Sequence, residues 1–166
     1  MVIEMQGVAK AVLVAIIVSI CFLLFLNFAL FFPWYSTLVI ETFNLSQIAA
    51  KDNYVKQSYY ENALENLKER PIYKDKSDKI EIEIMNSDYR EAVGFDDESI
   101  YTNEDYGYSD WDKPYRQRGE PITVTIKAVY PFTVTLWGKK YEREFPVEFS
   151  LQTIGLKHYK DLDYYD

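Results

Sequence analysis

The sequence predicts an α+β protein, in which an N-terminal transmembrane helix continues into an amphipathic helix packed on a small antiparallel sheet of three to four strands. Three observations lead to this prediction. An unbroken apolar run covers residues 11–32, apolar side chains then recur at helical spacing, and several later segments alternate apolar and polar residues. Together they indicate one anchor followed by one domain of ordinary size.

The apolar run is long enough to cross a membrane. A helix over residues 11–32 extends about 33 Å at about 1.5 Å per residue, which matches the hydrocarbon layer of a bilayer. Pro33, Trp34 and Tyr35 follow the run, and Trp and Tyr favour the headgroup region. A cleaved secretory signal is the alternative, but it would have a shorter apolar stretch and a small-residue cleavage site. Because the run ends in bulky side chains, we expect an uncleaved anchor over residues 11–35.

The positions of the basic residues predict how the anchor is oriented. Lys10 and the amino terminus lie on the short side, opposed by Glu4, whereas the long side has no Lys or Arg before Lys51. Positive charge close to a spanning helix favours the cytoplasmic side. We therefore expect a single-pass protein of the cell membrane with a short cytoplasmic N-terminus, residues 1–10, and an extracytoplasmic α+β domain, residues 36–166.

Composition argues against several classes of function. The formal net charge is −8, and no basic stripe is present to neutralise the phosphates of a nucleic acid. Cys21, the only cysteine, lies inside the anchor, and His158 is the only histidine, so the domain has no disulfide and no set of thiolate or imidazole zinc ligands. The sequence also has no P-loop, G-x-S-x-G or H-E-x-x-H motif. We expect no enzymatic activity, no cofactor and no metal.

A second helical pattern follows the anchor. Between about residues 36 and 69, apolar side chains recur at spacings of seven and four. Pro71 stops the helix, because proline cannot continue the backbone hydrogen bonds. We expect one long helix, straight or kinked, whose first part lies in lipid and whose second part packs against a sheet. The residues expected on its packed face are Ile48, Val55, Tyr59, Ala63 and Leu67.

Period-two alternation predicts the strands of this sheet. Residues 80–84 and 122–128 each alternate apolar and polar side chains. Pro131 interrupts the second segment, and the alternation resumes after it. A hairpin is expected to follow, with strands at about residues 132–137 and 141–154 joined by a turn at Gly138, Lys139 and Lys140.

A long polar insert, residues 86–120, follows the first strand and is rich in Asp, Glu and Tyr. We expect a short helix near residues 87–93 within it. Its clustered carboxylates are ligands that calcium prefers, but they lack the spacing of a calcium-binding loop, so a solvated acidic loop is the favoured interpretation. The 15 tyrosines indicate either a recognition surface or, as we favour, half-buried packing positions. The residues considered as a calcium-binding loop are Asp105, Gly107, Ser109, Asp110 and Asp112.

Short motifs at both ends of the chain are similar to those of a known family. They are QG followed by VAKAVLVAIIV at the start, and ITVTIKAVYPF and GKKYEREFPVEFSLQT near the end. In these motifs and in its layout the chain resembles the type IV pilin-like proteins, particularly the TadE-like minor pilins of tight-adherence pilus systems. The resemblance implies cleavage by a prepilin-type peptidase between Gly7 and Val8, and bundling of the mature helix with its neighbours. Where the family usually has a glutamate after the cleavage site, this chain has Val12.

Two hypotheses about function follow from the anchor and the insert. The first is a structural or assembly component of a surface pilus or secretion-type apparatus. Its N-terminal helix would contact the lipid bilayer and other pilin-like subunits or assembly proteins, within an oligomer or larger complex. The second is a membrane-tethered binding module that uses the acidic, Tyr-rich insert. Neither hypothesis involves nucleic acid.

Overall fold

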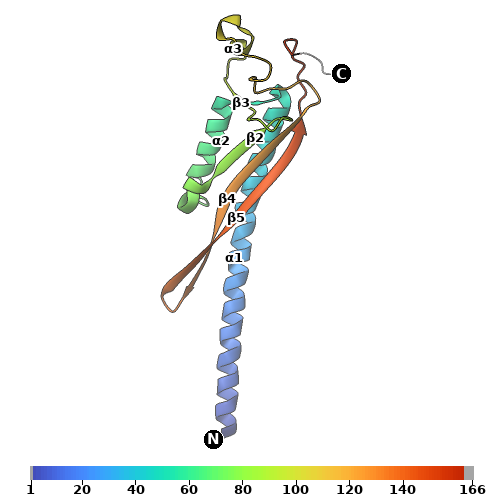
Figure 1. Ribbon diagram of the computed structural model, residues 1–166. Helices are drawn as coiled ribbons and strands as arrows, with labels where there is room; N and C mark the ends of the chain where they lie inside the picture. Colours follow the sequence, from blue (N-terminus) through green and yellow to red (C-terminus); the bar gives the residue numbers. More distant parts are fainter. Residues whose placement is uncertain (1, 163–166) are drawn as a thin grey trace.

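The computed structural model describes residues 2–162, so residue 1 and residues 163–166 of the predicted N-terminus and domain lie outside the described residues. One helix, α1 (Val2–Asp52), forms a rod, and the other elements gather around its C-terminal part (Figure 1). A second helix and a small antiparallel sheet lie beside it, so the predicted α+β class is confirmed. Among the described residues, one helix is long and apolar enough to cross a membrane, over Gly7–Asp52.

Two parts of α1 differ in their surroundings. We call residues 7–30 the free half, because their side chains are exposed except at Leu23 and Asn27, which are partly covered. We call residues 31–52 the packed half, because buried residues recur along it at helical spacing. The helix continues through Pro33, which removes one backbone hydrogen bond without ending the rod.

The chain reverses direction at Asn53, one residue after α1 ends. The backbone of Asn53 has a φ of 61°, a left-handed conformation that Asn tolerates better than most residues. Its Nδ2 donates to the carbonyl oxygens of Arg116 (2.9 Å) and Lys157 (2.6 Å), and its Oδ1 accepts from the N–H of Lys157 (2.9 Å). These bonds hold the reversal in place, and the expectation of one helix through residue 69 is wrong.

The second helix, α2 (Gln57–Glu69), runs back along the sheet, antiparallel to α1 (Figure 1). It ends before Pro71, as predicted, and buries Ala63 and Leu67. Tyr59 is half exposed, because the break at Asn53 shifts the phase of the apolar pattern. A short 3₁₀ segment, η1 (Lys74–Lys79), then leads into the sheet.

The main sheet is antiparallel and has the strand order β2-β4-β5. A separate parallel pair joins β1 to β3 near the end of α1. The strands predicted over residues 80–84 and 122–128 are confirmed. The bounds of the strands are β1 (Val55–Lys56), β2 (Glu81–Met85), β3 (Val93–Gly94), β4 (Pro121–Leu136) and β5 (Lys139–Ile154).

The core lies between the packed half of α1 and the apolar face of the sheet. Burying one large apolar side chain completely contributes roughly 1.5–3 kcal/mol, so this interface is the main source of stability. Its most deeply buried members include Trp34, Leu38, Leu45, Ala49, Ile84, Ile122, Val124 and Ile126.

The strand β4 is continuous, so the predicted interruption at Pro131 is wrong. Pro131 pairs with Glu144, and Pro146 pairs with Val129. Both pairs belong to the same alternating set of the ladder, in which the backbone nitrogen points away from the partner strand. The pairing of β2 with β4 ends at Lys127, so the missing N–H of Pro131 breaks no hydrogen bond of the sheet.

The hairpin turn is shorter than predicted and consists of Trp137 and Gly138. Leu136 pairs directly with Lys139, so Lys139 and Lys140 belong to β5 and not to a turn. Both turn residues have positive φ, 48° and 74°, as a type I′ turn requires. The two strands therefore pair over their whole length of 16 residues each.

The insert contains little regular structure. Its short helices are α3 (Ser99–Thr102) and the 3₁₀ segment η2 (Glu104–Tyr106), and it also contributes β3. The helix predicted near residues 87–93 is wrong. That segment begins with a turn in which Asn86 Oδ1 accepts from the N–H groups of Asp88 (3.0 Å) and Arg90 (3.1 Å).

Candidate functional site

The residues predicted to be processed lie in the free half of α1. Gly7 and Val8 are both exposed, and they belong to the continuous helix. Cleavage between them stays a prediction. Exposed apolar side chains surround the helix throughout this half. The large ones are Val12, Leu13, Val14, Ile16, Ile17, Val18, Ile20, Phe22, Leu24, Phe25, Leu26, Phe28 and Leu30.

Asn27 marks the point where β4 reaches the free half. The Tyr130 hydroxyl donates to the carbonyl oxygen of Asn27 (2.8 Å), and the Thr133 N–H donates to Asn27 Oδ1 (3.4 Å). Asn27 Nδ2 in turn donates to the carbonyl oxygen of Leu23 (3.0 Å). A polar residue within the apolar run therefore has its partners inside the protein, and the sequence did not identify this contact.

An aromatic cluster fills the junction between α1 and the sheet. The ring of Trp34 lies 5.1 Å from that of Tyr73 and 5.3 Å from that of Tyr130, which also meets Phe31 edge-on at 5.0 Å. The Tyr73 hydroxyl donates to the carbonyl oxygen of Trp34 (2.7 Å), and burial raises the pKa of that hydroxyl. Trp34 is only 2% exposed, so it packs in the core and does not face the headgroup region.

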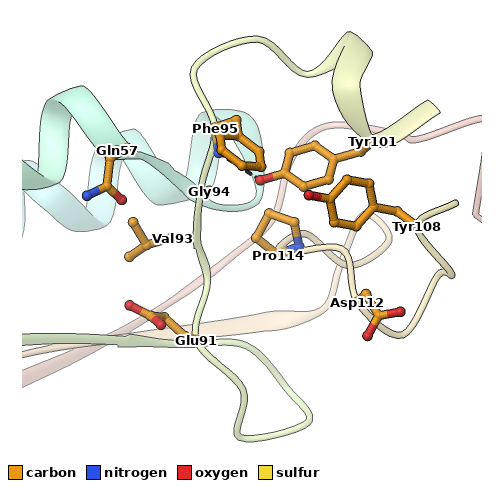
Figure 2. Close-up of a pocket in the computed structure, with 9 residues that line it drawn as sticks. All are labelled: Gln57, Glu91, Val93, Gly94, Phe95, Tyr101, Tyr108, Asp112 and Pro114. Carbon is orange, nitrogen blue, oxygen red and sulfur yellow. Dashed lines mark hydrogen bonds between the residues drawn. The ribbon is translucent and has the colours of Figure 1, made fainter. Parts of the chain in front are cut away.

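A cleft of about 410 Å³ opens in the insert, at the opposite end of the sheet from the free half of α1 (Figure 2). Tyr101 and Tyr108 lie side by side, with ring centres 5.3 Å apart, and Phe95 lies next to Tyr101. The Phe95 N–H donates to the Tyr101 hydroxyl (2.7 Å). The other lining residues are Gln57, Glu91, Val93, Gly94, Asp112 and Pro114.

Gly94 is required for the shape of this cleft. A Cβ atom at that position would lie 2.3 Å from the Tyr101 hydroxyl and 2.6 Å from Pro114 Cγ, which no real contact allows. The strand β3 therefore passes directly beneath the aromatic wall. The cleft combines aromatic faces with two carboxylates, Glu91 and Asp112, a lining that suits a cationic or amphipathic ligand.

Three tyrosines behind the cleft, together with Tyr101 of its wall, tie the insert to the end of α1. Tyr115 stacks on Tyr159 with ring centres 3.9 Å apart, and Tyr54 meets both Tyr101 and Tyr115. The Tyr159 hydroxyl donates to the carbonyl oxygen of Asp52 (2.7 Å). Burial raises the pKa of all four hydroxyls, which stay neutral at physiological pH. Much of the tyrosine content of this region therefore packs the interior.

Two acidic side chains of the insert, Asp110 and Asp112, have different partners. Asp110 and Asp161 both bind the buried ammonium of Lys113, at 2.8 and 2.9 Å. Burial opposes the charge of Asp161, but hydrogen bonds from Lys113 and Tyr115 lower its pKa overall. Asp112 accepts a hydrogen bond from the Ser109 hydroxyl (2.5 Å). Within residues 2–162, no three His, Cys, Asp or Glu side chains are grouped so as to hold a metal ion.

The single histidine lies on the tail that packs against the insert. His158 Nδ1 is 2.9 Å from Oε1 of Gln117, whose side chain also donates to the carbonyl oxygen of Tyr159 (2.8 Å). His158 thus helps to position the segment that carries Tyr159.

Comparisons of the chain with protein-family models, with curated proteins and with solved structures found no match. Arguments about function therefore depend on the two features described above, the exposed apolar half of α1 and the aromatic cleft. The sequence pointed to both regions. It did not distinguish which tyrosines of the insert line the cleft and which pack behind it.

Proposed function

We propose that this chain is a single-pass membrane protein of pilin-like architecture that acts as a structural or assembly component of a surface pilus or secretion-type apparatus. The observation that carries the proposal is the free half of α1, whose large apolar side chains are exposed all around the helix. A surface of this kind needs lipid or other apolar helices around it. Its length fits the hydrocarbon of a bilayer.

The continuity of α1 supports an assembly role. The same helix that protrudes from the domain also forms one side of its core, so contacts between free halves would fix the orientation of whole domains. Ala11, Ala15 and Ser19 recur every four residues and are exposed. Small residues at this spacing let helices approach closely in lipid, where packing drives association. In the proposed orientation the N-terminus is cytoplasmic and the domain lies outside.

Site-directed cross-linking in the native membrane tests the assembly role. Ala15→Cys in a Cys21→Ser background places one thiol on the small-residue face, whereas the wild-type chain carries Cys21 on a different face. We expect oxidation to produce cross-linked dimers at position 15 in preference to position 21. A chain that remains monomeric with either thiol, with no partner recovered by a general cross-linker, contradicts an assembly role.

The intact mass of the protein from its native membrane tests the pilin-like maturation. A mature chain that begins at Val8 shows cleavage after Gly7 by a prepilin-type peptidase. A chain that retains the residues before Gly7 leaves a plain signal anchor, and a membrane-resident assembly factor then becomes the better description.

The aromatic cleft supports a second candidate function, a membrane-tethered binding module. Its wall of Tyr101 and Tyr108 opens at the end of the domain that lies farthest from the free half. Tyr108→Ser removes one partly exposed wall residue and leaves the buried Tyr101 in place. If surface attachment or partner recovery is lost while cross-linking through α1 is kept, the module is favoured. Loss of cross-linking instead favours a cleft that serves assembly.

A further inference from the structure

The tip of the β4–β5 hairpin extends toward the membrane side of the molecule. Leu156, just after β5, donates from its N–H to the carbonyl oxygen of Ala50 (2.8 Å), near the end of α1. Tyr130, well along β4, bonds to Asn27. The hairpin therefore runs back along α1 toward its N-terminus, and its tip projects beside the free half and diverges from it (Figure 1).

The contact at Asn27 lies inside the apolar run. Asn27 precedes Phe32, the last residue of the run, by five positions, or about 7.5 Å of helix. Trp137 lies seven residues beyond Tyr130, which is about 23 Å of strand. If α1 spans a bilayer, the hairpin cannot remain wholly in water, because its tip lies level with residues that the hydrocarbon surrounds.

The composition of the tip suits that location. We call residues 132–145 the hairpin tip. Its side chains alternate across the ladder, so one face is mainly apolar and the other carries Thr133, Thr135, Glu142 and Glu144. Both glutamates are paired with Lys76. The apolar face consists of Phe132, Val134, Leu136, Tyr141 and Phe145, with Arg143 and Lys139 as its basic members.

Trp137 stands at the end of the tip in an unfavourable backbone conformation. It is 91% exposed, and its φ of 48° belongs to a region that bulky residues rarely adopt. Asn or Asp would fit a type I′ turn better. Tryptophan favours the interface between headgroups and acyl chains. The adjacent Lys139 is placed to meet anionic headgroups, whereas Lys140 pairs with Glu142 (3.0 Å) on the polar face.

We propose that the hairpin tip is a second membrane contact, which enters the outer leaflet of the same bilayer that α1 crosses. Trp137 and the apolar face lie toward the acyl chains, and the basic side chains lie among the headgroups. The outer edge of β5 has no strand partner among the described residues, and unpaired backbone groups are costly in hydrocarbon, so this edge limits how deeply the tip can enter the bilayer. This inference rests on the proposed anchoring by α1.

A polarity-sensitive fluorophore on single cysteines tests the inference in full-length protein. The protein is reconstituted into phosphatidylcholine–phosphatidylglycerol vesicles, and the variants carry Trp137→Cys or Tyr89→Cys in a Cys21→Ser background. Tyr89 is a matched control: it is an aromatic turn residue with φ 58° and 90% exposure, in the turn that follows β2. Met85, the last residue of β2, pairs with Thr123 near the start of β4, so this turn lies at the far end of the sheet. The third sample is the wild-type chain labelled at Cys21, which reports on α1.

We expect the emission from position 137 to shift to shorter wavelength and to be quenched by spin-labelled lipids, as at Cys21, while position 89 behaves as in water. Quenching at Cys21 with a water-like signal at position 137 overturns the hairpin contact and leaves the anchor standing. A water-like signal at both Cys21 and position 137 overturns the anchor and the hairpin contact together. Equal quenching at positions 89 and 137 also overturns the hairpin contact, because the domain would then be adsorbed on the membrane without a preferred face.

Discussion

The two halves of α1 are both rich in apolar residues, yet they have different neighbours. In the packed half, buried residues occupy one side, and the sheet covers them. In the free half, apolar side chains surround the helix, so a single sheet cannot cover them all. The comparison teaches that the distribution of apolar residues around a helix, more than their number, decides whether the domain or another apolar medium surrounds it.

The boundary between the halves is itself structured. Asn27 bonds to Tyr130 and Thr133, and the aromatic cluster around Trp34 begins one turn later. The sheet therefore overlaps the apolar run by more than one helical turn. The predictions below test the contrast between the halves, and then the boundary, in order of decreasing effect.

The largest effect is expected from matched leucines in the two halves. Leu38 is fully buried, whereas Leu24 is 49% exposed. Leu38→Ala leaves a cavity and should lower the free energy of unfolding by roughly 2–5 kcal/mol. Leu24→Ala should change it by less than about 0.5 kcal/mol in detergent micelles. Denaturant unfolding of the full chain, followed by near-ultraviolet circular dichroism, measures both. Equal losses would contradict the division of α1 into two halves.

The reversal after the packed half should be nearly as sensitive. Asn53→Ala removes three hydrogen bonds and leaves the part-buried carbonyl groups of Arg116 and Lys157 without their side-chain donor. We expect the free energy of unfolding to fall by roughly 3 kcal/mol. Asn53→Gly keeps the freedom to adopt φ 61° and isolates the loss of the side-chain bonds. Stability unchanged in both variants would mean that the side chain does not hold the reversal.

A smaller effect is expected at the boundary between the halves. Tyr130→Phe removes the hydrogen bond to Asn27 and should cost about 1 kcal/mol. Amide hydrogen exchange at Thr133 should become faster, because its own bond to Asn27 loses a neighbouring restraint. Tyr141→Phe, at a half-exposed position of the same hairpin, is the control and should leave both quantities unchanged. Identical exchange in the two variants would show that the boundary contact does not restrain the hairpin.

The smallest effect should appear in acid, where η1 is paired with the hairpin. Hydrogen bonds from Lys76 and Lys79 lower the pKa of Glu144 from 4.5 to about 2. Because the folded pKa is the lower one, ionised Glu144 stabilises the fold above pH 4.5, and this contribution is lost as the pH falls toward about 2. The difference in melting temperature between wild type and Glu144→Gln should therefore be constant near neutrality and should vanish in acid. A difference that grows in acid would contradict this pairing.

The elements that sequence predicted well are those in which local pattern and tertiary packing agree. The period-two segments over residues 80–84 and 122–128 and the end of the helix before Pro71 depend on neighbours in the chain. The break at Asn53 could not be predicted in the same way. Its left-handed backbone is stabilised by Arg116 and Lys157, which are distant in sequence.

The errors in the hairpin and the candidate cleft have a similar origin. Pro131 is tolerated in β4 because the pairing of β4 with β2 does not extend beyond Lys127. The local sequence around Pro131 does not reveal how far that pairing extends. In the insert, abundant tyrosine and acidic residues marked the region, but the roles of Tyr101 and Tyr108 depend on how Gly94 passes beneath them. Placement of that kind becomes visible only when distant segments are brought together.

The unbroken course of α1 also has a mechanical consequence. A force applied at the N-terminal end of the chain would enter the domain along the axis of the rod. It would load the contacts between the packed half and the sheet in shear, where many side chains resist at once, and it would not peel the β4–β5 ladder apart pair by pair. A protein built in this way can be pulled from its N-terminal end and move as one body.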